Sequence, residues 1–188
     1  MRLVIICCAL VALAACQKPS QPSTNEQGAA APAAPAKGAD SSHKGSTMPD
    51  AAFNDPDGNE TNLKAFAGKP TLVNLWATWC APCVKELPTL DRLAASEAGR
   101  LNVVAVSQDM GPQPSVEAFL QSHKIAALEA YHDPKMALSG ALGPDTVLPT
   151  SILYDASGKE VWRYVGDLDW TGPQAAKLLG EAGVTKGR

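Results

Sequence analysis

The strongest structural signal in the chain is the sequence from Leu72 to Leu93, which reads LVNLWATWCAPCVKELPTLDRL. Its first part belongs to a short apolar run, Thr71 to Ala77, of the kind that forms a buried β-strand. Its second part begins a stretch from Cys83 to Ala98 in which apolar residues recur at helical spacing, and Pro88 is expected to kink this helix. The chain therefore passes from a strand into a helix across a pair of cysteines.

Strands and helices continue to alternate after this unit. The apolar patterns predict strands at residues 101–107, 151–155 and 160–165, and helices at residues 115–123, 136–141 and 173–182. The last two strands form a hairpin around Ala156-Ser157-Gly158-Lys159, and the last helix has its N-cap near Thr171 or Gly172. Such a chain is expected to fold as an α/β sandwich with helices on both faces of a central sheet, and the hairpin makes that sheet mixed.

Length and composition favour one small, mildly acidic globular domain. The 188 residues are 45% hydrophobic, which suffices for a single core and little more. Charged residues make up 19%, and the formal net charge is −3 at pH 7. Because there is no basic excess to neutralise phosphates, a nucleic-acid partner is not expected.

The N-terminus is expected to be a targeting segment. One positive charge at Arg2 precedes an apolar run from Leu3 to Ala15, which is shorter than the roughly 20 residues that span a bilayer and fits a secretory signal. The run ends in Leu13-Ala14-Ala15-Cys16, which resembles a bacterial lipobox and implies cleavage before Cys16 and diacylation of that residue. Two alternatives stay open: cleavage by an ordinary signal peptidase after Ala12-Leu13-Ala14, or an uncleaved anchor. Each of them implies export.

Export also accounts for the odd count of five cysteines. Cys7 and Cys8 leave with the signal, and Cys16 carries the lipid. Cys80 and Cys83 then remain in a compartment in which disulfides form.

The chain is expected to divide into three parts. Residues 1–15 form a lipoprotein-type signal peptide, residues 16–47 comprise the lipidated cysteine and a disordered tether, and residues 48–188 form the folded domain. The tether holds four prolines among Ala, Ser, Gln and Gly, and such a stretch cannot bury enough apolar surface to offset its ordering entropy.

The pair Cys80 and Cys83 lies about one helical turn apart at the start of the predicted helix. A sulfur there lies over free backbone N–H groups and the positive end of the helix dipole, which favours the thiolate over the thiol. Cys80, nearer the helix end, is expected to attack a disulfide, and Cys83 to resolve the mixed disulfide. Pro82 stiffens the loop between them.

Two other interpretations of the cysteine pair are weaker. A structural zinc site needs a second pair of ligands, and the predicted domain offers only His123 and His132 besides these cysteines. A structural disulfide across so short a loop would remove little entropy from the unfolded chain. Redox chemistry is therefore expected, with no metal and no cofactor beyond the Cys80–Cys83 disulfide.

The motif Trp79-Cys80-Ala81-Pro82-Cys83 after a buried strand, together with Leu148-Pro149-Thr150 before a later strand, resembles the thioredoxin-fold proteins. The wider run from Leu72 to Leu93 is most similar to the TlpA/ResA group of membrane-tethered bacterial thiol–disulfide oxidoreductases. The closing segment from Val165 to Trp170 and the Leu148-Pro149-Thr150 loop resemble the TlpA type within that group. The resemblance covers about Met48 to Ala182. It implies a thioredoxin-like three-layer sandwich and thiol–disulfide interchange as the activity.

The resemblance also implies roles for residues around the cysteines. Pro149 matches the family's cis-proline, whose loop, with Leu148, faces the cysteine pair and offers backbone groups to a substrate strand; an ordinary trans-proline is the alternative. Trp79 and Pro82 are expected to contact the substrate. Trp79 should be at least partly exposed and Trp76 more buried.

Glu86, three residues after Cys83, matches a glutamate of the TlpA/ResA group that lies near the cysteines. A carboxylate there could take the proton from Cys83 as its sulfur attacks the mixed disulfide. A solvated helix residue is the alternative. Thioredoxin's buried aspartate corresponds to Asn74, which cannot act as a base, so any side-chain proton transfer would be the task of Glu86.

The resemblance favours reduction as the direction of the activity. Proteins of this group are kept in the dithiol state by a membrane electron donor and reduce cysteine pairs of clients, often apocytochrome c or copper-delivery proteins for cytochrome oxidase. Together with the lipobox, this implies a lipid-anchored protein on the periplasmic face of a bacterial membrane.

Two rival classes remain open. A copper chaperone of the Sco type would bind metal with a cysteine pair and a distant histidine, for which His132 is the candidate, although Sco proteins space their cysteines by three residues. A peroxidase of the peroxiredoxin group needs a Pro-x-x-x-Thr-x-x-Cys loop, and Thr78 lies too close to Cys80 for that pattern.

Overall fold

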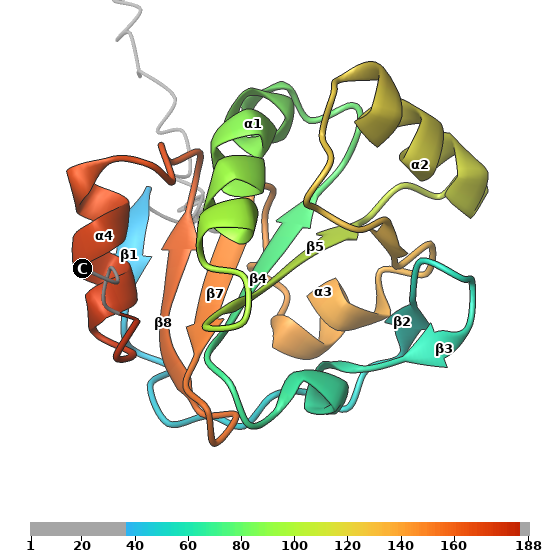
Figure 1. Cartoon of the computed structure of the whole chain (residues 1–188). Coiled ribbons are helices and arrows are strands. Elements are labelled where there is room, and N and C mark those ends of the chain that lie inside the picture. The colour runs from blue at the N-terminus through green and yellow to red at the C-terminus, as the bar shows by residue number, and fades with distance from the viewer. Residues whose placement is uncertain (1–36, 185–188) are drawn as a thin grey trace, which may run out of the picture. The chain divides into compact units, whose positions relative to one another are not determined.

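The computed structural model of the protein describes residues 37–184, and Figure 1 shows the course of the chain. Its strands are β1 (Gly38–Asp40), β2 (Phe53–Asn54), β3 (Glu60–Thr61), β4 (Thr71–Trp76), β5 (Asn102–Ser107), β6 (Tyr131–His132), β7 (Thr150–Tyr154) and β8 (Glu160–Val165). Its helices are the 3-10 helix η1 (Leu63–Phe66), α1 (Ala81–Ser96), α2 (Gln113–Ser122), α3 (Ala137–Leu142) and α4 (Pro173–Gly180).

The strands of the described residues form one mixed sheet in the order β1-β8-β7-β4-β5-β6-β2-β3. β4 pairs with β5, and β5 with β6, in parallel, whereas β7 pairs antiparallel with both β4 and β8. The mixed sheet expected from the hairpin is therefore confirmed. β4 lies in the middle of the sheet, and each of its residues is buried, as its predominantly apolar sequence predicted.

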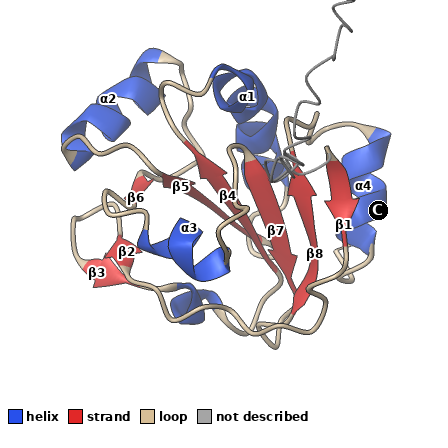
Figure 2. Ribbon diagram, turned by 180° about the vertical axis from the view of Figure 1, so that it is seen from behind, coloured by secondary structure: helices blue, strands red, loops and turns tan. Residues whose placement is uncertain are grey.

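Helices cover both faces of this sheet, as expected (Figure 2). Successive side chains of a strand point to opposite faces, and β4 shows the division clearly. Leu72 and Trp76 pack in the cluster that contains the buried side chains of α1, α2 and α4, whereas Val73 and Leu75 pack in the cluster beneath α3 and η1. Asn74 shares the face of Leu72 and Trp76, so its side chain lies on the side of α1.

The elements predicted from residue 71 onward are all present, with ends that differ from the expected ones by at most two residues. Gly172 is the N-cap of α4, one of the two positions predicted for it. The sequence patterns missed β2, β3 and β6, of two residues each, and the four-residue helix η1, because such short elements show no measurable hydrophobic period.

The predicted boundary of the tether is wrong over its last residues. β1 pairs antiparallel with β8, and the backbone N–H of Gly45 donates to the carbonyl of Glu160 at 2.8 Å. Residues 38–40 thus extend the sheet, and Gly45 and Thr47 pair with the hairpin beyond them. Backbone pairing of this kind needs no apolar side chain and leaves no hydrophobic pattern. The signal segment at residues 1–15, Cys16 and the first part of the tether lie outside the described residues. Between residues 37 and 184, no helix combines the length and the apolar character required to cross a bilayer.

Candidate active site

The two cysteines lie where β4 has ended and α1 begins, and they form a disulfide. Cys80 is the N-cap of α1, and its sulfur accepts a hydrogen bond from the backbone N–H of Cys83 at 3.3 Å. Cys80 is 6% exposed, whereas Cys83 is fully buried. The first sulfur therefore has both a backbone donor and a path to the surface, and the second sulfur has neither solvent nor client access of its own.

Cys80 opens on a groove of about 550 Å³. The residues lining this groove, which we call the client groove, carry no charge; they are Trp79, Cys80, Ala81, Pro82, Gln108, Met136, Ser139, Thr146, Val147 and Leu148. Trp79 is 69% exposed and Met136 is 44% exposed, so large apolar side chains stand in solvent beside the sulfur. Trp76, by contrast, is 1% exposed, and both expectations about these tryptophans are confirmed. An uncharged, partly apolar groove at a redox-active sulfur suits a protein segment with neutral side chains around its cysteine.

The peptide bond between Leu148 and Pro149 is cis, as the family resemblance implied. Leu148 lines the client groove. Pro149 is buried, and its carbonyl accepts a hydrogen bond from the N–H of Gly166 at 2.9 Å. Of the four residues predicted to contact a substrate, three line the groove beside Cys80: Trp79, Pro82 and Leu148. The fourth, Pro149, is buried, and its hydrogen bond with Gly166 anchors the loop.

The loop that leads into Cys80 is held by Asp109, which follows β5. The carboxylate of Asp109 accepts hydrogen bonds from the backbone N–H of Thr78 at 3.0 Å and from its hydroxyl at 2.7 Å. The hydroxyl of Ser107 donates to the same carboxylate at 2.7 Å. Sequence patterns did not single out Asp109, because its bond to Thr78 spans 31 residues of sequence.

Met136 enters the client groove from an unusual backbone conformation. Its φ of 52° and ψ of 32° lie in the left-handed region, which non-glycine residues rarely adopt. The carboxylate of Asp133 accepts hydrogen bonds from the N–H groups of Ala137 and Leu138 at 2.9 and 2.8 Å and so caps α3 just behind Met136. The cap offsets the backbone strain at a position that shapes the groove.

Glu86 lies on the same helix but in a different environment. It is 2% exposed, so the alternative of a solvated helix residue is wrong. One carboxylate oxygen accepts a hydrogen bond from the amide of Asn74 at 2.8 Å. The other accepts from the backbone N–H of Leu168 at 3.1 Å and from the indole N–H of Trp170 at 3.3 Å.

Burial raises the pKa of Glu86 from 4.5 to about 7, because the charged form is poorly solvated inside the protein. The hydrogen bonds from Asn74, Leu168 and Trp170 oppose this shift, and the nearby negative charge of Asp167 adds to it. A carboxyl group with a pKa near neutrality can both accept and return a proton at physiological pH. Glu86 and Cys83 are separated by three positions in one helix and therefore share a face.

Three partners of Glu86 were not foreseen. The sequence indicated only that Asn74 cannot act as a base. Its amide, besides binding Glu86, donates to the hydroxyl of Ser151 at 2.9 Å and so links β4 to β7. Leu168 and Trp170 come from the segment between β8 and α4, and the sequence assigned no role at the site to either residue. No spacing rule could have found them, because they lie 82 and 84 residues from Glu86.

The two histidines considered for metal binding lie in different surroundings. His132 is 2% exposed, and its Nε2 lies 2.7 Å from the backbone carbonyl of Asp109. His123 is exposed and stacks on Phe119. Within residues 37–184, no three His, Cys, Asp or Glu side chains gather in a way that could hold a metal ion.

Comparisons with known proteins agree with this geometry. A family model described as Redoxin matches residues 43–179. The thiol-disulfide oxidoreductase ResA of Bacillus cereus is 31% identical over 126 residues, which are 65% of this chain and 70% of that protein. A solved structure from Chlorobium tepidum, described as a thiol:disulfide interchange protein DsbE, is 27% identical with a TM-score of 0.63 and covers 74% of this chain and 96% of its own.

A thiol-disulfide oxidoreductase structure from Bacteroides vulgatus is 28% identical, with the same TM-score of 0.63 and the same coverage of 74% and 96%. These similarities confirm the resemblance that the Cys80–Cys83 motif implied, and they confirm the thioredoxin-like fold.

Proposed function

Since the chain belongs to the Redoxin family, we propose that it is an exported reductase that cleaves disulfides of client proteins through Cys80 and Cys83. Its relatives show that it is a thiol–disulfide oxidoreductase. The observation that carries the proposal is the division of the pair at the start of α1: Cys80 opens on the client groove, and Cys83 is enclosed behind it.

The first step is the attack of the Cys80 thiolate on a client disulfide. The backbone N–H of Cys83, which donates to the Cys80 sulfur, and the N-terminus of α1 stabilise this thiolate. A bond forms between the Cys80 sulfur and one client sulfur, and the other client sulfur leaves as a thiolate. Trp79 and Leu148 border the groove in which the client segment lies during this step.

The second step is the attack of Cys83 on the Cys80 sulfur of the mixed disulfide. Cys83 first gives up its proton, and Glu86 on the same face of α1 accepts it. The bond between Cys80 and the client sulfur then breaks, and this client sulfur leaves as a thiolate. The protein is left with the Cys80–Cys83 disulfide that the structure contains. Two electrons have passed to the client, so a dithiol donor must reduce the pair before the next cycle.

The clients that fit this groove are proteins with a cysteine pair among neutral side chains. The resemblance to the TlpA/ResA group favours apocytochrome c or the copper-delivery proteins of cytochrome oxidase, and a thiol–disulfide protein of the membrane as electron donor. The absence of charge among the groove-lining residues supports a client whose disulfide lies in an uncharged segment.

The proposed location is the periplasmic face of a bacterial membrane, with a lipid on Cys16. The support is the lipobox-like sequence that ends at Cys16 and the Pro-rich segment that follows it. Because β1 begins at Gly38, the tether in this proposal ends about ten residues earlier than its composition suggested.

The reduction potential of the Cys80–Cys83 pair tests the proposed direction. The full chain is equilibrated with thiol–disulfide buffers of known potential, and the fraction of reduced pair is measured. A potential near that of thioredoxin, roughly −270 mV, is expected for a reductase. A value near roughly −120 mV would identify an oxidant instead and overturn the proposed direction.

A further inference from the structure

We propose that Trp170 is a positioning residue for Glu86: its indole N–H holds the carboxylate in the orientation from which it serves Cys83. This inference rests on the proposed function, in which Glu86 accepts the proton of Cys83. In this role Trp170 acts through Glu86.

The two oxygens of Glu86 are held from two different parts of the fold. Asn74, on the central strand β4, donates to one oxygen at 2.8 Å. Leu168 and Trp170, on the segment between β8 and α4, donate to the other at 3.1 and 3.3 Å. Donors on both sides fix the plane of the carboxylate as well as its position. Of the two donors on the second oxygen, only the indole of Trp170 belongs to a side chain.

Trp170 is in turn tied to the helix that carries Glu86. Its backbone N–H donates to the hydroxyl of Thr89 at 3.2 Å, and that hydroxyl donates to the backbone carbonyl of Glu86 at 2.8 Å. The indole is 2% exposed and belongs to the cluster that also contains Leu178 and Leu179 of α4. Trp170 therefore connects α1 and α4 at the position of Glu86.

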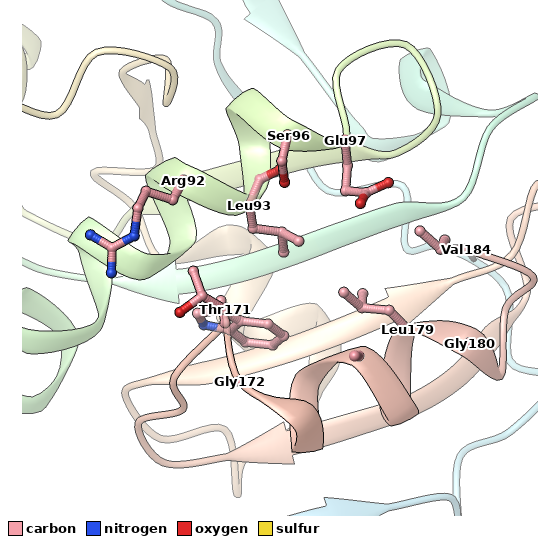
Figure 3. Close-up of a pocket in the computed structure, with 11 residues that line it drawn as sticks. Arg92, Leu93, Ser96, Glu97, Thr171, Gly172, Leu179, Gly180 and Val184 are labelled. Atoms are coloured by element: carbon pink, nitrogen blue, oxygen red, sulfur yellow. The ribbon is translucent and has the colours of Figure 1, made fainter. Parts of the chain in front are cut away.

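The same indole lines a pocket of about 460 Å³ between α1 and α4. Figure 3 shows Leu93 of α1 facing Leu179 of α4 across this pocket, with Arg92 and Thr171 towards one end. The indole thus borders this pocket on one side and donates its N–H to Glu86 on another. Loss of the hydrogen bond would leave both the ring and the carboxylate with more freedom.

The hydrogen bond also bears on the charge of Glu86. The indole donor favours the ionised carboxylate and opposes the effect of burial on the pKa of Glu86. Three other ionisable groups lie near Glu86: Asp167, Lys37 and Cys83. The charge of Asp167 raises the pKa of Glu86, and the charge of Glu86 in turn raises the pKa of Lys37. Lys37 and Lys85 form ion pairs with Asp167, so its charge is largely compensated.

The test is the pH dependence of client reduction by the full chain carrying Trp170→Phe, measured with a disulfide-containing peptide between pH 5 and 9. Loss of one hydrogen bond to a charged group is expected to move the apparent pKa of the rate profile upward by about one unit. Trp162→Phe is the matched control. Trp162 is fully buried and donates its indole N–H to the backbone carbonyl of Leu178 at 3.0 Å. Its replacement also removes a buried indole hydrogen bond, but not one to Glu86, and should leave the profile in place.

Glu86→Gln separates this inference from the proposed function. If Glu86→Gln removes the inflection near pH 7 and Trp170→Phe leaves it unmoved, the positioning role is wrong and the role of Glu86 stands. If Glu86→Gln keeps the wild-type profile, the proposed proton transfer itself is wrong. Should Trp170→Phe fail to fold, Thr89→Val takes its place. It removes the hydroxyl that holds Trp170, and an unmoved profile would equally overturn the inference.

Discussion

Cys80 and Glu86 lie on the same helix, but their surroundings are opposite. Cys80 caps α1, opens on the client groove and has exposed Trp79 as its neighbour. Glu86 lies further along α1, is 2% exposed, and has hydrogen bonds to both carboxylate oxygens from three residues of the protein. The surface end is accessible and sparsely bonded, whereas the interior end is enclosed and tightly bonded.

The difference fits the roles proposed for the two groups. A sulfur that exchanges electrons with a protein has to be reached by that protein, and its thiolate is stabilised by the helix end rather than by burial. A carboxyl that exchanges a proton near pH 7 needs a raised pKa, and burial is the main cause of the raised pKa of Glu86. One helix serves both needs because its first residue lies at the edge of the fold and its second turn lies on the sheet.

The largest effect on client reduction is expected at the surface end of α1, where replacement of Cys80 and of its enclosed partner Cys83 should have different consequences. Cys80→Ser removes the attacking sulfur, and client reduction should fall on the order of a thousandfold or more. Cys83→Ser keeps the attacking sulfur but cannot resolve the mixed disulfide. Gel electrophoresis without reductant should therefore show a protein–client adduct with Cys83→Ser and none with Cys80→Ser. Adducts of equal yield from both variants would mean that the two sulfurs do not divide the work.

Glu86→Gln should remove a pH dependence of stability that originates in the interior. In the unfolded chain Glu86 ionises near 4.5, whereas in the folded protein its pKa is about 7. Between these two values the unfolded state loses the proton first, so the free energy of unfolding falls as the pH rises and is lowest above 7. The difference between the two pKa values corresponds to a change of about 3 kcal/mol in the free energy of unfolding.

Urea titrations of the oxidised protein at pH 4.5, 6 and 8 measure this effect. The wild type should lose stability along the series, and Glu86→Gln should lose less, because its amide does not ionise. Parallel pH curves for the two proteins would show that Glu86 is not the group whose ionisation opposes folding.

Trp79→Ala should have the smallest effect, and it should be confined to the surface end. Since Trp79 is 69% exposed, its removal should change the free energy of unfolding by less than about 0.5 kcal/mol. The lost contact with the client should raise KM by roughly 3- to 10-fold, with little change in kcat. Steady-state kinetics with a protein client and a parallel denaturation curve give both quantities. A clear loss of stability would show that Trp79 supports the fold rather than the client.

Local sequence was sufficient for much of this architecture. The buried strand β4, the helix after it and the hairpin were predicted because the pattern of each is contained in residues that are close in the sequence. The placement of Cys80 at the helix start followed from the same spacing, and the cis bond before Pro149 followed from the family resemblance. The edge strand at residues 38–40 escaped prediction, since a strand held by backbone hydrogen bonds needs no apolar residues.

The order of residues along the chain thus specified where a sulfur would meet the end of a helix. It did not specify that Glu86 would be enclosed, or that Asn74 and Trp170 would hold its two oxygens. Those contacts join β4, α1 and the segment before α4, and they exist only once the sheet has assembled. Burial and long-range hydrogen bonds depend on which elements pack together, and no local pattern records that choice.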